Sequence, residues 1–593
     1  MSLKPLGLNH FRLRIGDTDA LPQWLLIGLL SGLLTGLLML AFLQATTWPL
    51  QQALPDGNPE NFEALPPLAR LLLPMLGSLV VGLVLWRFAS AAKVGIAHVL
   101  ERLSYHQGRM PLSNLLVQFF TASISLISGH SGGREGPAVH LGAAASSLLG
   151  QHLRLPNNSL RTLIGCGTAA AIAAAFNTPL AGIIFAMEVV MMEYTVAGFI
   201  PVMVAAITST LVLRLALGEY SVFEVPAFEV QTLQEIPFII LLGMIVGLLA
   251  VLFSKLLVVI SGWQKPSIFI RLQIAGVATG VAALLLPEIM GIGYDTVNQI
   301  LAGQGTLKLL LILAAVKLLI TAVAIGLGMP MGLIGPTLFI GAAAGAAMGT
   351  LGIAAAGTPV SDIGLYAMLG MGAMMAATLQ APLAALMALL EMTLNANIIL
   401  PGALAILSAT LTYRYCFRQG SAFQAMLFSR GLDWQRAPLE RFLERTSVFA
   451  LMLKDPPKSG RYLDPVAAQQ LASAAGDWIL VLDQDQPKAC LARADLLLHL
   501  QQRKAQQQQS DPQQQESTAD KPDTPDQPID LLDVPALRLD LAEISIQASL
   551  HEALQTLDQH DVDALCVLSH TQAPLGLLLR TSINHHYMYK KSE

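Results

Sequence analysis

The strongest constraint on this chain is the scarcity of charged side chains over long stretches. Residues 162–213 contain only two acidic or basic residues, Glu188 and Glu193, and residues 318–390 contain only Asp362. Charged residues make up 13% of the chain, against about 25% in a typical soluble domain. Mean hydropathy is +0.57. The pattern excludes a globular soluble protein and predicts a polytopic α-helical membrane protein.

The charge balance also excludes a class of partners. The net charge is -5 and the chain has no basic tract, so nucleic-acid binding is not expected. The cysteines are scattered and form no CxxC pair or His-flanked cluster, so the sequence predicts free thiols and no metal site. They are Cys166, Cys416, Cys490 and Cys566.

The apolar segments vary in length, and several are too short to cross a bilayer, which takes about 20 residues. Glycine and proline interrupt them. Such segments predict tilted, broken helices whose ends meet inside the protein near the middle of the membrane. We expect a transport domain at 23–430, after a cytoplasmic N-terminus at 1–22 whose Lys4, Arg12 and Arg14 favour that orientation.

The chain also resembles itself. GPAVHLGAAASSLLG (136–150) matches GPTLFIGAAAGAAMG (335–349), and AFNTPLAGIIFAMEV (175–189) matches TLQAPLAALMALLEM (378–392) at nearly the same separation. Chance similarity of Ala/Gly-rich sequence explains one match more easily than two in the same order. We therefore predict two inverted repeats, roughly 68–217 and 270–417, with the substrate site where the two GP motifs meet.

The motif SGGREGP (131–137) places glycines and a charged pair directly before an apolar helix. Pro137 suits a first helical turn, and the free amides of a helix N-terminus attract an anion. An ionisable residue at this depth indicates function, although a structural ion pair of Arg134 and Glu135 is the alternative. A carboxylate beside an anion site can occupy the place of the anion and leave when protonated, so Glu135 is a candidate gate.

These residues are similar to those of the CLC family of chloride channels and chloride/proton exchangers. The resemblance is carried by GREGP (133–137), the GxxxP loop (332–336), NTPLAG (177–182) and the repeat. It implies a CLC-type inverted-repeat fold, a homodimer in the lipid bilayer with one chloride pathway per subunit, no required cofactor and no enzymatic activity.

The family's site residues carry over by position. Glu135 matches the gating glutamate, and the backbone amides around Arg134 and Gly136 match the anion-binding positions, as do those of Leu333 and Ile334. In KVGIA (93–97), Val94 replaces the usual serine, and Phe423 stands at the position of the pore tyrosine. Each missing hydroxyl removes a charge-assisted hydrogen bond of roughly 1.5–3 kcal/mol.

Other polar residues near the pathway have two interpretations each. Lys93 either attracts anions at the inner mouth or is a solvated or lipid-facing lysine. His130 and His140 flank the gate and make the pathway pH-sensitive unless they are packing histidines. Val189 aligns with the second proton-handling glutamate of exchangers, and its neighbour Glu188 is either a substitute or a structural carboxylate.

The sequence after residue 430 is more polar and contains short β-like runs, which predicts a soluble α/β tail. We expect a degenerate first CBS-like motif at 431–500, a disordered Gln/Pro-rich insert at 501–530 and a second CBS-like motif at 531–593. CBS pairs often bind adenine nucleotides. Here Ser582 replaces the aspartate that commonly contacts ribose and Leu579 replaces a hydroxyl residue, so a purely structural tail is the alternative.

The losses at Val189, Val94 and Phe423 favour a chloride-selective channel gated by Glu135, because coupling needs an internal proton route and a well-held anion. The alternative is a chloride/proton antiporter with a non-standard proton pathway. An intramembrane enzyme or a cation-coupled carrier would need an acid/base pair or clustered ligands, which the sequence lacks. We expect a bacterial inner-membrane location with both termini cytoplasmic.

Overall fold

The computed structural model describes residues 21–194, 196–218, 222–223, 233–356, 361–432, 443–444, 446–484, 486–509, 528–569 and 572–589. These fall into two compact units. The membrane domain comprises 19–153 and 159–435, and the tail comprises 436–593 together with 1–18 and 154–158. Each unit is considered by itself.

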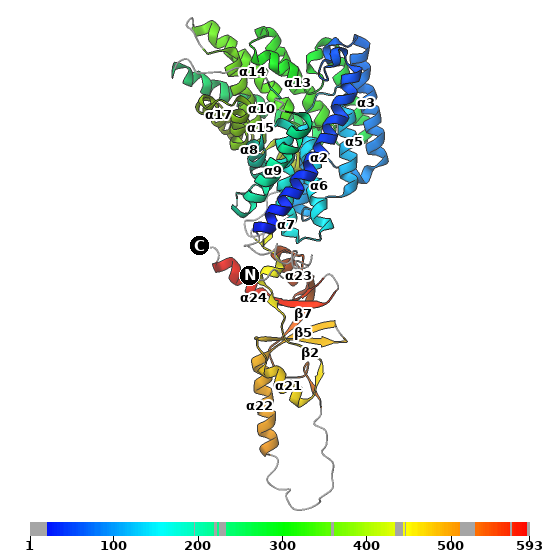
Figure 1. Cartoon of the computed structure of the whole chain (residues 1–593), viewed down its shortest axis with the longest axis vertical. Helices are drawn as coiled ribbons and strands as arrows, with labels where there is room; N and C mark the ends of the chain where they lie inside the picture. The colour runs from blue at the N-terminus through cyan, green and yellow to red at the C-terminus, as the bar shows by residue number, and fades with distance from the viewer. Residues whose placement is uncertain are drawn as a thin grey trace, which may run out of the picture. The chain divides into compact units, whose positions relative to one another are not determined.

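The membrane domain is entirely helical in its described part (Figure 1). Nine of its described helices are long and apolar enough to cross a membrane, and others are too short, as the broken apolar segments predict. In chain order, the α-helices are α2 (Leu21–Ala53), α3 (Pro67–Arg87), α4 (Gly95–Tyr105), α5 (Leu112–Ile127), α6 (Glu135–His152), α7 (Asn157–Phe176), α8 (Pro179–Phe185), α9 (Val196–Leu217), α10 (Ile236–Gly262), α11 (Ile268–Leu285), α12 (Tyr294–Leu301), α13 (Leu307–Gly326), α14 (Ile334–Ala356), α15 (Ile363–Leu379), α16 (Pro382–Thr393), α17 (Ile399–Phe417) and α18 (Ala422–Ser429).

The helices follow the predicted duplication. The described residues of 67–217 form seven α-helices, α3 to α9, and those of 268–417 form seven more, α11 to α17. The short α4 and α12 correspond, as do α6 and α14 with their GP starts. The inverted-repeat fold predicted from the sequence is therefore confirmed.

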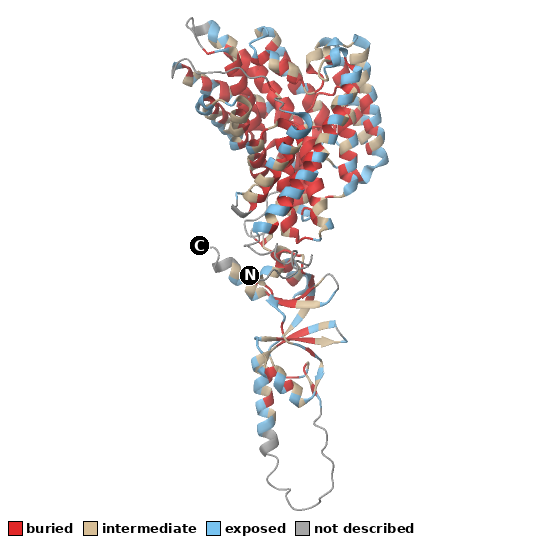
Figure 2. Ribbon diagram, in the orientation of Figure 1, coloured by how far each residue is buried: buried red, intermediate tan, exposed pale blue. Residues whose placement is uncertain are grey.

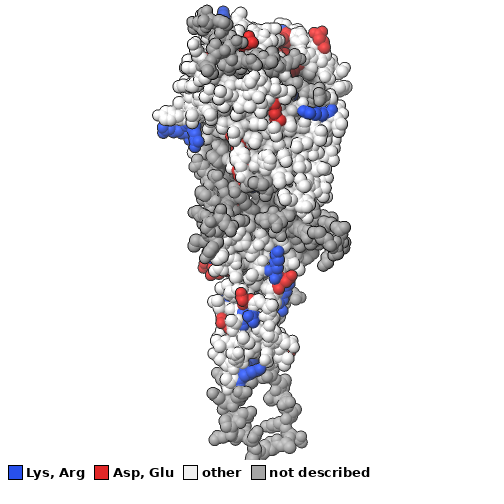
Figure 3. Space-filling view, turned by 60° about the vertical axis from the view of Figure 1, so that its left-hand side comes forward, with Lys and Arg blue, Asp and Glu red and all other residues white. Residues whose placement is uncertain are grey.

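The domain exposes large apolar side chains on its surface as well as burying them. Helix α15 is buried along almost its whole length, whereas α2 exposes leucines such as Leu26 and Leu37 (Figure 2). Charged side chains are sparse on the part of the domain face that Figure 3 describes. Since lipid is as apolar as a protein core, exposed leucines suit a membrane-facing surface.

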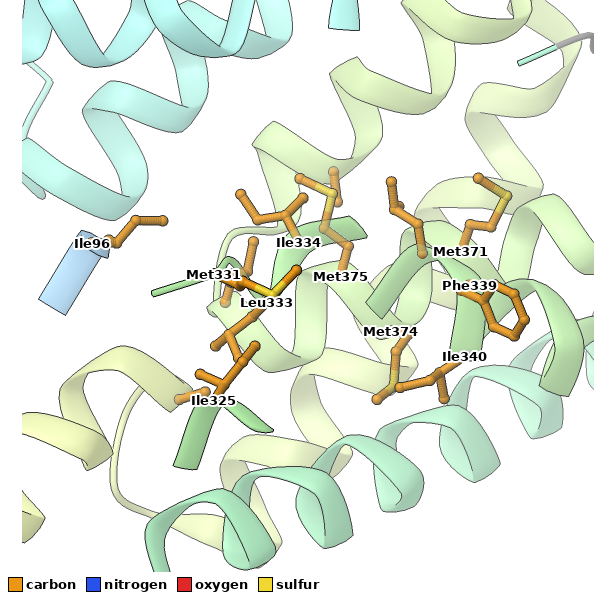
Figure 4. Packing of buried hydrophobic residues seen from close by; sticks show 14 of the residues in the cluster. Ile96, Ile325, Met331, Leu333, Ile334, Phe339, Ile340, Met371, Met374 and Met375 are labelled. Carbon is orange, nitrogen blue, oxygen red and sulfur yellow. The ribbon is translucent and has the colours of Figure 1, made fainter. Parts of the chain in front are cut away.

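Small residues explain how the central helices approach one another. A Cβ atom on Gly341 would lie 2.3 Å from the carbonyl oxygen of Gly370, and one on Gly345 would lie 2.1 Å from that of Tyr366. Close backbone packing of α14 and α15 is thus the reason for the Gly/Ala-rich repeats. Larger side chains, including Phe339, Ile340 and Met374, fill the space around the contact (Figure 4).

The tail is an α/β unit whose two halves share one pattern. A seven-stranded sheet has the order β1-β9-β8-β7-β5-β4-β2. In the first half β2 and β4 are parallel, and β5 pairs with β4 in the antiparallel sense. In the second half β7 and β8 are parallel, and β9 pairs with β8 in the antiparallel sense. The strands are β1 (Leu453–Lys454), β2 (Lys458–Gly460), β4 (Trp478–Asp483), β5 (Gln486–Ala492), β7 (Arg538–Ser545), β8 (Ala564–Leu568) and β9 (Pro574–Leu579); β3 (Tyr462–Leu463) pairs with β6 (Ile529–Asp530).

Helices alternate with these strands, as expected for two CBS-like motifs. They are α20 (Val448–Leu451), α21 (Pro465–Ser473), α22 (Arg493–Gln509), α23 (Leu550–His560) and α24 (Arg580–Tyr589). One boundary was wrong: α22 continues to Gln509, so the segment from 501 to 509 is helical and belongs to the first motif. The helix former Gln and the contact of α22 with α21 explain this extension. Residues 510–527 of the expected insert, and the N-terminal residues 1–20, lie outside the described residues.

Candidate functional site

The two GP loops meet face to face inside the membrane domain. The amide of Gly133 donates to the carbonyl of Gly332 at 2.8 Å, and the amide of Gly332 donates to the carbonyl of Gly133 at 2.7 Å. These reciprocal bonds join the loops that precede α6 and α14. The two GP motifs therefore meet as predicted, and the location of the substrate site at their junction stays a prediction.

Glycine is required at this junction because the two backbones nearly touch. A Cβ atom on Gly136 would lie 2.5 Å from the Cα of Gly332, and one on Gly332 would lie 2.4 Å from the amide nitrogen of Gly136. Neither neighbour is a flexible side chain that could move aside. The spacing of the two helix N-termini is thus fixed by the absence of side chains.

We expect Gly332→Ala to separate the two loops and abolish chloride flux. Overpacking a tight site costs about 1–3 kcal/mol, so the yield of monodisperse protein on gel filtration should also fall. Gly262→Ala is the matched control, because a Cβ atom there meets no atom within 4 Å. Normal flux per folded Gly332→Ala protein would show that the loop spacing does not matter.

Glu135, the first residue of α6, is completely buried between these loops. One carboxylate oxygen, Oε2, accepts a hydrogen bond from the amide of Gly335 at 3.1 Å. The other, Oε1, accepts a hydrogen bond from the hydroxyl of Tyr294. The carboxylate of the first repeat therefore occupies the N-terminal turn of the second repeat's helix α14, which is a position suited to an anion.

Arg134 contributes to the surroundings of the gate from the N-cap position of α6. Its Nη2 donates to the carbonyl of Ala175 at 3.3 Å. Its guanidinium carbon lies 5.6 Å from the centre of the Tyr294 ring, within the range of a cation–π contact. Arg134 and Glu135 therefore both contact Tyr294, one at its ring and the other at its hydroxyl.

A separate cavity of about 430 Å³ brings together four of the predicted residues: Lys93, Val94, Leu333 and Phe423 all line it. Leu333 lies directly before α14 and next to Met331 (Figure 4). Val94 is the N-cap of α4, and Phe423 lies in the first turn of α18. The two positions that lost hydroxyl groups thus face one common space, and Glu135 lies outside the set of residues that line it.

Lys93 does not act as an isolated charge at this cavity. Its Nζ lies 2.6 Å from Oε1 of Glu101, and the lysine side chain is 63% exposed while the glutamate side chain is 9% exposed. The adjoining loop is fixed by Gln118 of α5. Its Oε1 accepts from the amide of Gly95 at 2.7 Å and its Nε2 donates to the carbonyl of Pro330 at 3.1 Å.

Tyr294 is a candidate site residue that reasoning from sequence missed, and its hydroxyl donates to Glu135. It opens α12, and a T-shaped contact with Phe223 at 4.9 Å helps to orient its ring. The duplication carried the signal, because Gly95 and Tyr294 have the same separation as Gly136 and Gly335. The start of α4 lines the cavity that contains Val94 and Phe423. The corresponding start of α12 is therefore a reasonable place to search for another residue of the pathway.

The loop before α12 is held by a buried lysine in the same way that Gln118 holds the loop before α4. Lys317 of α13 is fully buried and donates to the carbonyls of Ile289 and Gly291 at 2.9 and 3.0 Å. Its Nζ also lies 4.8 Å from the centre of the Phe339 ring. Lys317 thereby fixes the backbone that leads into Tyr294.

Glu60, in the loop between α2 and α3, reaches the start of α12 from another direction. Its Oε2 accepts from the amide of Asp295 at 2.9 Å. Burial, and then the nearby carboxylate of Asp295, raise the pKa of Glu60. Glu60 is therefore protonated more readily than an exposed glutamate, and it caps the helix that presents Tyr294 to the gate.

Val189 stands where exchangers of the family carry a second proton-handling glutamate, and unlike Glu135 it cannot bind a proton. Val189 is buried in the π-helical turn η4 (Ala186–Met191). Its neighbour Glu188 accepts from the amides of Leu383 and Ala384 at 3.3 and 2.8 Å, at the N-terminus of α16. Glu391 of the second repeat binds the first repeat in the same way. Its carboxylate accepts from the amides of Leu180 and Ala181, at the N-terminus of α8, at 3.0 and 2.7 Å. This exchange between repeats favours a structural role for Glu188.

The remaining predicted residues lie apart from the gate. His130 and His140 are both fully buried, and a ring nitrogen of His140 lies 2.9 Å from one of His98. These contacts favour the packing role. Ser582 lies in α24 of the tail, and its nucleotide contact stays a prediction. Within the described ranges, no cluster of three or more His, Cys, Asp or Glu residues could hold a metal ion.

Comparisons with known proteins agree with this geometry. The family model described as "Voltage gated chloride channel" matches residues 76–414. A protein of Ralstonia nicotianae, named "Putative chloride channel protein ClcB-like", is 34% identical over 370 residues, which cover 60% of this chain and 85% of the relative. The "H(+)/Cl(-) exchange transporter ClcA" of Vibrio parahaemolyticus is 31% identical over 307 residues, which cover 50% of this chain and 66% of the relative.

Solved structures show the same fold. The structure of a slow cyanobacterial Cl-/H+ antiporter matches with a TM-score of 0.59 at 25% identity, and covers 69% of this chain and 97% of that one. A eukaryotic CLC transporter matches with a TM-score of 0.58 at 16% identity, over 95% of this chain and 98% of that one. The second match extends through the tail and supports the fold alone.

Proposed function

The chain belongs to the family of voltage-gated chloride channels, and from this premise we propose that it is a chloride/proton antiporter. The sequence favoured a passive channel and kept the antiporter as its alternative. The comparisons favour that alternative, because several similar proteins are named as exchangers. The burial of Glu135 between the two GP loops, with its carboxylate bound to the amide of Gly335, supports a protonatable gate on the anion pathway. The names of the relatives are what favour an antiporter over a channel.

The proposed mechanism uses one site for both ions. An ionised Glu135 carboxylate occupies the N-terminal turn of α14 and is stabilised there by Gly335 and Tyr294. Protonation removes the charge that these donors favour, so the side chain leaves and an anion takes its place. Return of the carboxylate expels the anion and releases the proton. Chloride and proton movements are thereby linked at a single residue.

A water-mediated route is the inner proton pathway in this proposal, since Val189 cannot carry a proton. A void of about 10 Å³, roughly the space of one water molecule, is lined by residues that include Thr178, Phe185 and Ile334. The buried hydroxyl of Thr178 has no hydrogen-bond partner among the described residues. Ile334 begins α14 beside the gate, so a water at Thr178 would lie on a route from the η4 turn towards Glu135.

A passive chloride channel is the second candidate. It is favoured by Val189 at the position of the second proton acid, and by a relative whose name describes a chloride channel. In that case Glu135 would still gate the pathway, but no proton would accompany each opening. The two candidates share the anion pathway and differ only in whether protons cross the membrane.

The setting of the protein is part of the proposal. We expect a homodimer in a bacterial inner membrane with cytoplasmic termini, because the relatives that match are bacterial and the N-terminus is basic. Lys93 and its cavity then face the cytoplasm, since α2 and α3 each cross the membrane once. For the tail we propose a structural role without a required nucleotide, because Ser582 and Leu579 lack the expected groups.

Simultaneous recording of chloride and proton movement in proteoliposomes tests this function. An antiporter moves protons against their gradient when chloride flows down its own, at a fixed ratio. A channel moves chloride without protons. Uphill proton movement driven by chloride is the expected result, and chloride flux without proton movement would contradict the antiporter.

A further inference from the structure

The inner cavity contains more positive charge than chloride passage requires. Besides Lys93, two arginines line it: Arg271 in the first turn of α11 and Arg430 at the C-cap of α18. Among the described residues that line the cavity there is no Asp or Glu. Glu101 is paired with Lys93 and also acts on Arg430, so one carboxylate serves two cations and Arg271 adds a further positive charge.

The Arg271 side chain keeps one buried donor unused within the part of the chain that the structure describes. The Nε of Arg271 is buried and has no hydrogen-bond partner among the described residues. The two guanidinium groups lie close enough for the charge of Arg430 to act on Arg271. A buried donor without a partner costs about 1–3 kcal/mol, and two like charges around one space repel each other. An anion in the cavity would relieve both penalties.

The shape of the donors indicates which anion fits. Guanidinium groups present forked N–H donors that match the oxygens of phosphate or a carboxylate in pairs. Chloride, a single sphere, cannot use such a fork. The cavity of about 430 Å³ is also far larger than one chloride ion. The arrangement therefore suits an anion with several oxygens.

We propose that Arg271 and Arg430 form a binding site for a phosphate-type oxyanion at the inner mouth of the pathway. The site lies beside Val94, Leu333 and Phe423, so a bound oxyanion obstructs the passage of chloride. This inference rests on the anion transport proposed above, but not on its coupling to protons. Phosphate in the cytoplasm thereby limits the transport rate.

The first experiment measures chloride flux from proteoliposomes made of neutral lipid, with inorganic phosphate or sulfate on the Lys93 side. We expect both oxyanions to inhibit flux, and tetrafluoroborate, an anion without oxygen, to have no effect at equal ionic strength. The flux of each variant is first measured without phosphate. In both Arg271→Gln and Arg430→Gln, the phosphate concentration that halves this flux should then be about tenfold higher or more than in wild-type protein. Arg418→Gln, which removes an exposed arginine outside the cavity, should leave it unchanged.

Two further arms complete the test. Repeating the assay in vesicles containing phosphatidylglycerol shows whether lipid phosphates fill the site, since they would then remove the sensitivity to free phosphate. Purified wild-type protein should gain thermal stability with phosphate, and the double variant Arg271→Gln/Arg430→Gln should not. Equal inhibition by phosphate and tetrafluoroborate in neutral lipid, or unchanged inhibition in the double variant, overturns the proposal. Loss of proton coupling alone would leave it standing.

Discussion

Replacing Glu135 with glutamine should uncouple chloride from protons. A neutral amide keeps the size of the side chain but cannot bind or release a proton, and it loses the charge that holds it on the N-terminal turn of α14. We expect proton transport to fall to the background of protein-free vesicles. Chloride flux should become independent of pH and reach, at pH 7, the level that wild-type protein shows only in acid.

The matched control is Glu391→Gln. Its carboxylate also sits on a helix N-terminus, where it accepts from the amides of Leu180 and Ala181, but it lies outside the two GP loops. This variant should retain pH-dependent flux and proton coupling. If Glu135→Gln still moves protons with the wild-type ratio, Glu135 is not the group that links the two ions.

Replacing Tyr294 with phenylalanine should shift the pH dependence of transport without abolishing it. The hydroxyl donates to the Glu135 carboxylate, and a hydrogen bond to a charged group contributes about 1.5–3 kcal/mol. Its loss makes the ionised, seated carboxylate less stable, so protonation and displacement occur at lower proton concentration. At 1.36 kcal/mol per pH unit, the pH of half-maximal flux should rise by about 1–2 units.

A second tyrosine provides the control for this variant. The hydroxyl of Tyr366 donates to Oε2 of Glu235 at 2.6 Å, and this pair likewise consists of a buried phenol and a carboxylate. Tyr366→Phe should lower thermal stability and leave the pH of half-maximal flux in place. An unchanged pH profile in Tyr294→Phe would mean that the tyrosine packs against the gate without controlling it.

The fold was predictable because its main determinants are local or repeated in the sequence. Scarce charge indicated the membrane, and the matched GP motifs indicated both the duplication and the meeting of the two loops. The reciprocal hydrogen bonds of Gly133 and Gly332 follow from that symmetry. Glycine at these positions also signalled close backbone approach, which the Cβ distances at Gly136 and Gly332 explain.

Side-chain partnerships were less predictable, because they depend on which distant segments meet. Lys93 pairs with Glu101, which lies two helical turns later in the chain. The motif KVGIA alone does not reveal this ion pair. Glu188 is bound by amides of the other repeat, which no local pattern shows. Arg271 and Arg430 come from segments without a recognisable motif, and they line one cavity only because α11 and α18 pack together there.

The most direct test of the central claim is proton movement driven by a chloride gradient in proteoliposomes. Vesicles with equal pH on both sides and a tenfold chloride gradient should pump protons opposite to the chloride flow. Proton and chloride fluxes should keep a constant ratio, and Glu135→Gln should abolish the proton signal while chloride still moves. Chloride flux in the wild-type protein without any proton movement would contradict the antiporter and establish a passive channel.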